Sequence, residues 1–214
     1  MIEANSQAVD SKALERSQEV FELMEKCRRQ GDIKPNERVY TSFIRALAKG
    51  KSKNLHKKAY FLLQKMRELY EAGNEGIKPT VFTYNAVLHA CSESLHIEGI
   101  PRLDAFKVAV TVFNEMRKDN EELDHVTFGN MLRCASLLPE GEKRNALIET
   151  TFRLCCESGF VNSYVIRDLQ NSAPEELWRS LLGRPEGDVE MESLPAKWSY
   201  KFERRREKSN RRSR

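Results

Sequence analysis

The amino-acid sequence predicts an all-α protein: an α-solenoid of helix-turn-helix repeats with a disordered basic C-terminal tail. Apolar side chains recur at positions i, i+3, i+4 and i+7, the spacing that places them on one face of an α-helix. One such pattern returns every 44 residues. The last 14 residues contain eight lysines and arginines, and charge runs of this kind are typically disordered.

Two sets of amphipathic helices alternate along the chain. The first set opens with an aromatic residue in each copy, and its stripes begin at Tyr40, Tyr84 and Phe128. The stripes of the second set begin at Val20, Ala59, Ala109 and Ile148. A single helix pair cannot bury two apolar faces, so neighbouring pairs must stack into a continuous core.

Glycine and proline mark two of the junctions between repeats. Gly31 and Gly76 each follow a helix of the second set, where a positive φ helps to end the helix. Pro35 and Pro79 come shortly afterwards and prevent the helix from continuing. The third junction, residues 121–124, has neither residue, so its register depends on periodicity alone.

These signals divide the chain into four regions. We expect an N-terminal partial repeat that contributes only a second helix, then three repeats, two capping helices, and a linker that leads into the tail. The boundaries are 1–36 for the partial repeat, 37–163 for the array (37–80, 81–124 and 125–163), 164–183 for the capping helices and 184–214 for the linker and tail. Residues 1–10 lack the pattern of a first helix, which predicts that the chain is a fragment of a longer protein.

Composition argues against several classes of protein. Hydrophobic residues make up 40% of the chain, and no stretch approaches the ~20 apolar residues of a membrane-spanning helix. The first 28 residues contain six acids, unlike a secretory signal or an arginine-rich transit peptide. The five cysteines are scattered and form no Cys-x-x-Cys pair, which predicts apolar helix residues in a reducing compartment and no metal site.

The segment Gly76–Leu88 resembles the pentatricopeptide repeat. The family's motif runs Gly-Ile-x-Pro-Asp and then x-x-Thr-Tyr-Asn-x-Leu-Ile, and the segment contains Gly-Ile-Lys-Pro-Thr-Val-Phe-Thr-Tyr-Asn-Ala-Val-Leu. Residues 34–47 and 124–135 are weaker copies, so the resemblance covers residues 12–163. The repeats run 44, 44 and 39 residues, against about 35 in the family, and we expect the surplus to lie in loops.

The resemblance implies that the chain binds single-stranded RNA, one base per repeat. In this family the residue after Thr-Tyr and the residue that closes the repeat recognise a base together, and the second residue of the repeat packs against it. Asn85 with Asp124 matches a pairing that favours uracil. The same carry-over identifies Arg38, Thr41 and Thr80 in the first repeat, Phe82 in the second and Val126 in the third. Gly129 has no side chain, so the last repeat is expected to recognise no base.

Two basic stretches are candidates for phosphate contacts. Residues 45–67 contain eight lysines and arginines and no acid, and residues 201–214 carry a local charge of +6, which leaves −2 for the rest of the chain. Such clusters neutralise phosphates and make binding sensitive to salt. The candidates are Lys49, Lys51 and Lys53 in the first stretch and Arg204, Arg205 and Arg206 in the tail. A solvated surface or a solubilising tail is the alternative interpretation of both stretches.

No catalytic motif stands out, because the sequence contains no glycine-rich phosphate loop, paired zinc motif or serine nucleophile elbow. We therefore predict a protein that is not an enzyme and that uses no cofactor or metal. The resemblance implies a monomer in a mitochondrion or plastid that acts in RNA processing, stability or translation, with ribosomal or RNA-processing proteins as further partners. The alternatives are a protein-interaction scaffold, favoured by the body charge of −2, and a structural component of a ribosomal or RNA-processing complex.

Overall fold

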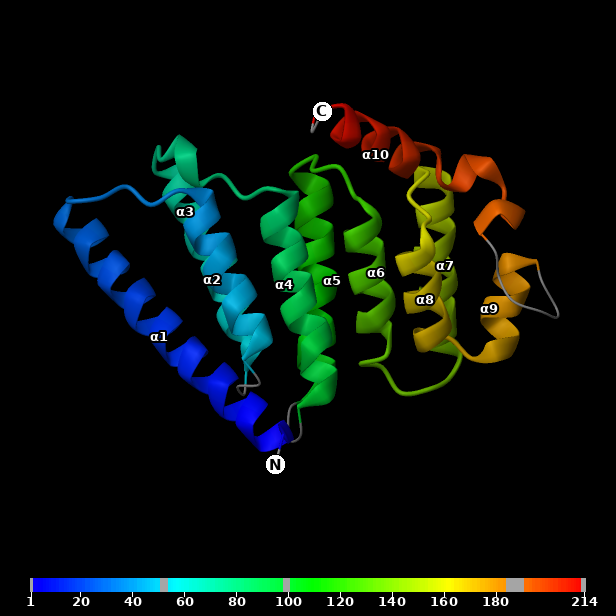
Figure 1. Cartoon of the computed structure of the whole chain (residues 1–214), viewed down its shortest axis with the longest axis horizontal. Helices are drawn as coiled ribbons and strands as arrows, with labels where there is room; N and C mark the ends of the chain where they lie inside the picture. Colours follow the sequence, from blue (N-terminus) through cyan, green and yellow to red (C-terminus); the bar gives the residue numbers. More distant parts are fainter. Residues whose placement is uncertain (1, 51–53, 98–100, 184–190, 213–214) are drawn as a thin grey trace. The chain divides into compact units, whose positions relative to one another are not determined.

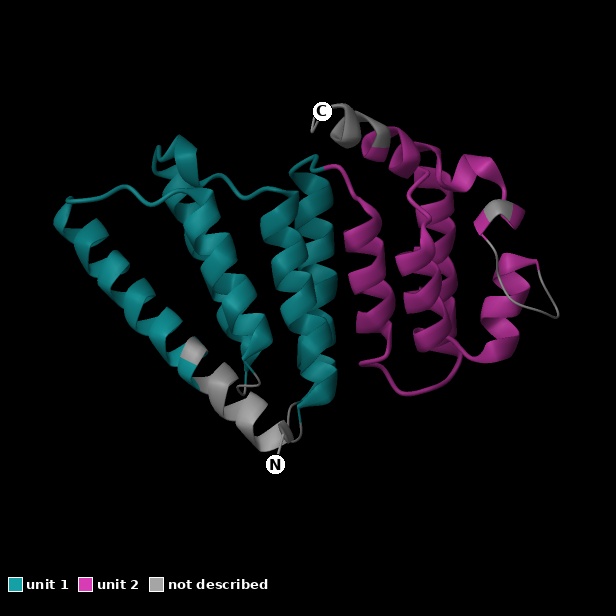
Figure 2. Ribbon diagram, in the orientation of Figure 1, with its two compact units in different colours: residues 1–121 teal, residues 122–214 magenta. Residues whose placement is uncertain are grey.

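The computed structural model describes residues 2–50, 54–97, 101–183 and 191–212 (Figure 1). Within these ranges the chain forms helices and turns and no strand, so the predicted all-α repeat architecture is confirmed. The chain divides into two compact units, Met1–Glu121 and Glu122–Arg214 (Figure 2).

The first unit contains a long helix and two helix pairs. Helix α1 spans Ile2–Gln30, the first pair is α2 (Glu37–Lys49) and α3 (Leu55–Glu71), and the second pair is α4 (Val81–Glu93) and α5 (Arg102–Lys118). Two 3-10 turns, Glu75–Ile77 and Ser94–His96, lie in the connections. Helix α2 packs against α3 and α4, and α4 packs against α3 and α5. We call the helix that opens a pair its first helix.

Helix α1 is longer than the sequence pattern indicates. The apolar stripe predicts a helix over Lys12–Arg29, whereas the structure begins it at Ile2. Residues 2–30 contain neither glycine nor proline, so no residue in this stretch interrupts the helix before Gln30. Its C-terminal half packs on α2, where Phe21 stacks on Phe43 with ring centroids 4.1 Å apart.

Two buried tyrosines connect the helices of the first unit through charged groups. Tyr40 of α2 donates a hydrogen bond to Glu25 of α1, and the Glu25 carboxylate also forms an ion pair with Lys65 of α3. Burial opposes ionisation of Glu25, but hydrogen bonds from Arg28, Lys65 and Tyr40 lower its pKa to about 2. The carboxylate is therefore charged inside the unit, and it joins three helices.

Tyr84 of α4 occupies the equivalent position in the next pair. Its hydroxyl donates to Asp119, which directly follows α5, and Asp119 also accepts a hydrogen bond from Arg67 of α3 at 2.9 Å. Burial, followed by the bond to Asp119, raises the pKa of the Tyr84 hydroxyl. In both pairs, an acid and a base from two neighbouring second helices meet at the tyrosine of a first helix.

The second unit contains two helix pairs and a C-terminal helix. The pairs are α6 (His125–Ala135) with α7 (Glu142–Ser158), and α8 (Ser163–Ser172) with α9 (Glu175–Leu182). Two 3-10 turns, Met191–Ser193 and Ala196–Trp198, precede α10 (Tyr200–Arg212). Helix α6 packs against α7 and α8. The core is apolar and includes Phe128, Leu132, Phe152, Phe160, Val165 and Leu169.

The chain before α10 is anchored at the end of α7. Trp198 meets Phe152 edge-on, with ring centroids 5.8 Å apart, and its carbonyl accepts a hydrogen bond from the Val161 N–H at 2.8 Å. The N–H groups of Lys201 and Phe202 both donate to the carbonyl of Gly159, at 3.0 and 3.1 Å. A Cβ atom at Gly159 would lie 2.5 Å from the Tyr200 ring, so only glycine allows this approach.

Residues 200–212, which were expected to belong to a disordered tail, form α10. Three contacts hold the start of this helix: the two backbone bonds to Gly159, ion pairs of Lys201 and Arg205 with Glu122, and the position of both cations over the Phe160 ring. The charge pattern alone could not reveal this helix, because its partners Gly159, Phe160 and Glu122 lie far from residues 200–212 in the sequence. The expected linker at 184–190 lies outside the described residues.

Candidate nucleic-acid interface

Each first helix begins after a residue that caps its N-terminus. The capping residues are Asn36, Thr80, Asp124 and Asn162. Asp124 illustrates the geometry: its carboxylate accepts from the Thr127 N–H at 2.9 Å, and its own N–H donates to the Thr127 hydroxyl at 3.2 Å. Such caps satisfy N–H groups that have no partner within the helix. Thr80 and Asp124, the predicted repeat-closing contacts, therefore also start the following helix.

The structure brings Thr41 and Thr80 to one carboxylate that the sequence pattern did not reveal. Glu37, the first residue of α2, accepts hydrogen bonds at one oxygen from Thr41 at 2.8 Å and from Thr80 at 3.1 Å. Thr83 of α4 donates to the same oxygen at 3.0 Å. An acid in the first turn of a helix is favoured by the helix dipole, and this was the available signal for Glu37.

This cluster has a defined chemical preference. A hydroxyl group has one proton and two acceptor lone pairs. When Thr41 and Thr80 direct their protons to Glu37, their oxygen atoms are left to accept hydrogen bonds. The cluster then suits a ligand group that donates, such as the exocyclic amino group of a nucleobase.

Asn85 and Asp124 are both buried, at 7% and 8% exposure. Asn85 lies in α4 of the first unit, whereas Asp124 precedes α6 of the second unit. The pair spans the boundary between the units, so its joint contact with a base stays a prediction.

The second residue of each first helix is exposed, as a surface that packs against bases requires. Arg38, Phe82 and Val126 occupy this position in α2, α4 and α6, and Phe82 is 62% exposed. Exposed aromatic rings provide stacking surfaces for bases. The structure thus leaves the three predicted packing residues accessible.

Helix α8 adds a fourth position of the same kind, which the sequence pattern did not single out. Tyr164 is its second residue and is exposed, and the Arg167 guanidinium lies 5.3 Å from the centre of the Tyr164 ring. Asn162 caps the helix in the same way as Asp124 caps α6. The cap followed by an aromatic residue was a signal in the sequence, although residues 164–183 were expected only to cover the array.

Gly129 of α6 lies where α6 and α8 approach closely. A Cβ atom at this position would lie 2.6 Å from a carboxylate oxygen of Asp168 in α8. Burial raises the pKa of that carboxyl, although Arg133 and Arg167 act in the opposite direction. The glycine therefore serves helix packing, and the expectation that the third repeat recognises no base stays a prediction.

The predicted basic contacts differ in their surroundings. Lys49 is exposed in the last turn of α2, and Lys51 and Lys53 lie outside the described residues. In α10, Arg205 forms an ion pair with Glu122 and lies 4.8 Å from the centre of the Phe160 ring. Arg204 and Arg206 are exposed on the same helix. The tail therefore divides into an arginine that holds α10 in place and arginines that face solvent.

One buried and one half-buried thiol, those of Cys134 and Cys156, are poor nucleophiles. Burial raises the pKa of Cys134 and of Cys156 to about 12, and the thiolate is the reactive form. Across the described ranges, no group of three or more histidines, cysteines and acids is placed to hold a metal ion. Nor does any helix in the same ranges combine the length and apolar character needed to cross a membrane.

Comparison with known families agrees with the repeat geometry. The family model of the pentatricopeptide repeat domain matches residues 22–94, which run from the C-terminal part of α1 to the end of α4. A search of curated proteins found no match. Proteins of this family are generally non-catalytic RNA-binding helical repeat proteins. The resemblance seen in the sequence is thereby confirmed for residues 22–94, which match the pentatricopeptide repeat domain.

Proposed function

We propose that this protein binds single-stranded RNA without catalysing a reaction, and that it acts in RNA processing, stability or translation in an organelle. The repeats at 37–80 and 81–124 are the proposed units of base recognition, and the repeat at 125–163 provides a packing surface without recognising a base. The observation that carries the proposal is the exposed side chain at the second position of successive first helices, in a region that matches an RNA-binding repeat family.

The three repeats have different proposed roles. Phe82 stacks on a base while Asn85 contacts its edge. Thr41 and Thr80, held by Glu37, accept from the amino group of the preceding base. Arg38 and Lys49 contact phosphates or base faces at the first repeat, and Val126 provides an apolar surface at the third.

A stacking contact can be tested with a matched pair of variants. Phe82→Ala should weaken binding of a short uridine-containing RNA by about tenfold, because stacking of one base on an aromatic ring contributes ~1–3 kcal/mol. Phe61→Ala is the control, since Phe61 is 66% exposed but lies on α3, a second helix. Fluorescence anisotropy measures both affinities. Equal losses in the two variants, or no binding at low salt, would contradict the proposal.

The tail separates sequence recognition from general phosphate binding. The double variant Arg204→Gln with Arg206→Gln should lower affinity for all single-stranded RNAs alike and reduce the salt slope by about 1.4, since each phosphate contact contributes ~0.7. Selection from random RNA pools should return the same short motif with this variant as with the unchanged chain. Motif-free binding that disappears with the double variant would favour a structural role in a larger RNA complex.

A further inference from the structure

One face of the first helices is buried in α4 and α8 but not in α2. This face, which we call the leading face, consists of the third, sixth, seventh and tenth residues of a first helix. In α4 these residues are Thr83, Ala86, Val87 and Ala90, and all are buried. In α8 they are Val165, Asp168, Leu169 and Ser172, and all are buried as well.

The preceding first helix covers the leading face in both cases. Thr83 of α4 lies 2.8 Å from the Thr41 hydroxyl of α2, and α2 and α4 pack along their length. In the second unit, Asp168 of α8 faces Gly129 of α6, and those helices pack in the same way. The chain itself therefore shows twice that an α-helix is what fits this face.

In α2 the same face is accessible. Val39 is 40% exposed, Ser42 is exposed, and Phe43 and Ala46 are only half-buried. Helix α1 covers one side of α2 through the stack of Phe21 on Phe43, but it leaves its own Val20 67% exposed. Apolar surface of this kind, gathered in one place, is typical of a binding site.

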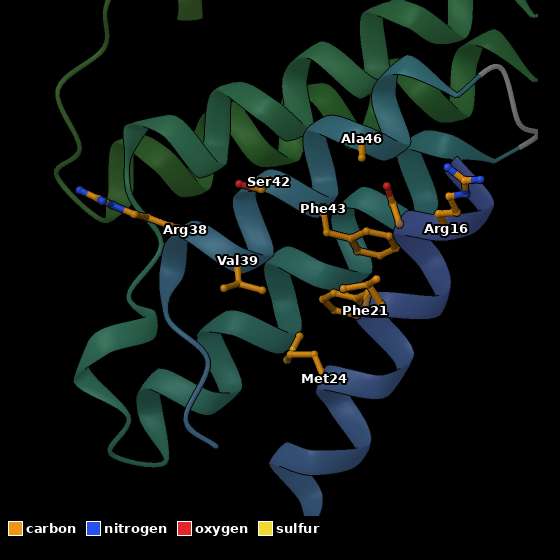
Figure 3. Close-up of a pocket in the computed structure, with 10 residues that line it drawn as sticks. Arg16, Phe21, Met24, Arg38, Val39, Ser42, Phe43 and Ala46 are labelled. Carbon is orange, nitrogen blue, oxygen red and sulfur yellow. The ribbon is translucent and has the colours of Figure 1, made fainter. Parts of the chain in front are cut away.

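The two helices enclose a groove of about 530 Å³ (Figure 3). Its apolar wall combines Val20, Phe21 and Met24 of α1 with Val39, Phe43 and Ala46 of α2. Arg16 and Arg38 lie at opposite sides of the groove in the view of Figure 3, and the described lining residues include no acid. The same apolar surface, which we call the floor of the groove, thus lies between two positive charges.

We propose that this groove docks one amphipathic α-helix of another protein, with an apolar stripe for the floor and acidic residues that meet Arg16 and Arg38. The docked segment is a helix because helices cover the same face elsewhere in the chain: α2 packs on the leading face of α4, and α6 packs on that of α8. The acidic flanks follow from the two arginines. Docking of an amphipathic helix in an apolar groove is a common mode of recognition, and here it adds a protein-binding surface to the proposed RNA-binding face.

The probe is a stapled peptide with the sequence of residues 36–50, because α2 is the helix that covers this face in the next pair. In its acidic form the peptide carries Arg38→Glu, Arg45→Glu and Lys49→Glu, and in its basic form these residues are unchanged. We expect the full chain to bind the acidic form with 1:1 stoichiometry and the basic form more weakly. Anisotropy of a labelled peptide and calorimetry measure affinity and stoichiometry.

Two surface variants of the protein test the location. Val39→Glu and Val20→Glu should each weaken binding of the acidic peptide by about tenfold or more, the size expected for a charge placed in an apolar contact. Leu103→Glu is the control, since Leu103 is an exposed apolar residue of α5. Because all three positions are exposed, circular dichroism should show unchanged folding.

Several results would overturn the proposal. These are no binding of the acidic peptide, equal binding of both peptides, or binding that Val39→Glu and Val20→Glu leave unchanged. Sedimentation that shows a dimer of the chain, abolished by Val20→Glu, would assign the groove to a second copy instead. RNA affinity measured on Val20→Glu, which lies on a helix without a proposed RNA contact, keeps this test separate from the proposed function.

Discussion

Tyr40 and Tyr84 in the first unit and Phe128 in the second all stand fourth in a first helix, 44 residues apart, and all are fully buried. The hydroxyl groups of the two tyrosines bond to charged side chains that join neighbouring second helices. Phe128 has no hydroxyl and lies in an apolar core, with Trp198 and Phe202 packed against that core from the chain leading into α10. The same position in the repeat thus supports two kinds of packing.

The difference shows how each unit specifies its neighbours. Buried charges contribute little net stability when they are paired, but they strongly penalise any arrangement that separates them. The first unit therefore has a specific helix order at a modest energetic gain. Apolar packing is less selective, and in the second unit the exact contact comes from the close approach of Gly159 and Tyr200.

The largest effect is expected from Glu25→Ala. The variant leaves Lys65 and Arg28 beside Tyr40 without their carboxylate, and removal of one partner from a buried ion pair costs about 4 kcal/mol. Native-state hydrogen exchange should show this loss in amides of α2 and α3 but not in α6 and α8. Glu19→Ala is the control, because Glu19 is an exposed acid of the same helix. Equal loss in both units would contradict the comparison.

Acid should destabilise the first unit in a specific pH range. The pKa of Glu25 is 4.5 in its unperturbed state and about 2 in the fold, so the unfolded chain binds its proton first as the pH falls. The stability that Glu25 contributes is present above pH 4.5 and is lost as the pH falls toward 2, by ~3 kcal/mol in total. Hydrogen exchange at a series of pH values measures this, and Glu25→Gln should remove this part of the dependence. A profile that this variant leaves unchanged would disprove the role of Glu25.

Gly159→Ala tests the contact that closes the second unit. Gly159 and Gly183 both end a helix with positive φ, 74° and 66°, but only at Gly159 would a Cβ atom meet other atoms. We expect Gly183→Ala to cost about 1 kcal/mol from the backbone alone, and Gly159→Ala about 2 kcal/mol. The amides of Lys201 and Phe202 donate to the Gly159 carbonyl. They should exchange faster in Gly159→Ala but not in Gly183→Ala. Equal exchange in both variants would show that the Tyr200 ring moves aside without a loss of stability.

The smallest effect is expected from Tyr84→Phe. The change keeps the buried ring but removes the hydrogen bond to Asp119 and the one that the hydroxyl accepts from Arg67 at 3.1 Å, while Arg67 still pairs with Asp119. The free energy of unfolding of the first unit should fall by about 1.5 kcal/mol, since a hydrogen bond contributes ~0.5–1.5 kcal/mol. Urea unfolding followed by exchange of α4 amides measures it. A loss as large as that of Glu25→Ala would mean that the hydroxyl, rather than the charges, holds the network.

Much of the candidate interface could be predicted from the sequence because its residues are tied to helix starts. Capping is local, and a polar residue before an apolar stripe identifies the start of a helix. The resemblance to the pentatricopeptide repeat then assigned Arg38, Phe82 and Val126 to one equivalent position, the second residue of each repeat. The same logic could have found Tyr164 after Asn162. Glu37 could not be found as the centre of a cluster, since Thr80 and Thr83 reach it from another helix.

By itself the sequence determined the repeated helices, their alternation and the resemblance of residues 22–94 to the pentatricopeptide repeat, because helix periodicity, caps and helix-ending residues act within a few residues of each other. Only the tertiary structure decided which charges meet around Tyr40 and Tyr84, and that the basic tail begins as a helix held by Gly159 and Glu122. It also decided that the leading face of α2 is accessible while that of α4 is covered. These outcomes depend on which surfaces come together, and no local pattern specifies the partner of a surface.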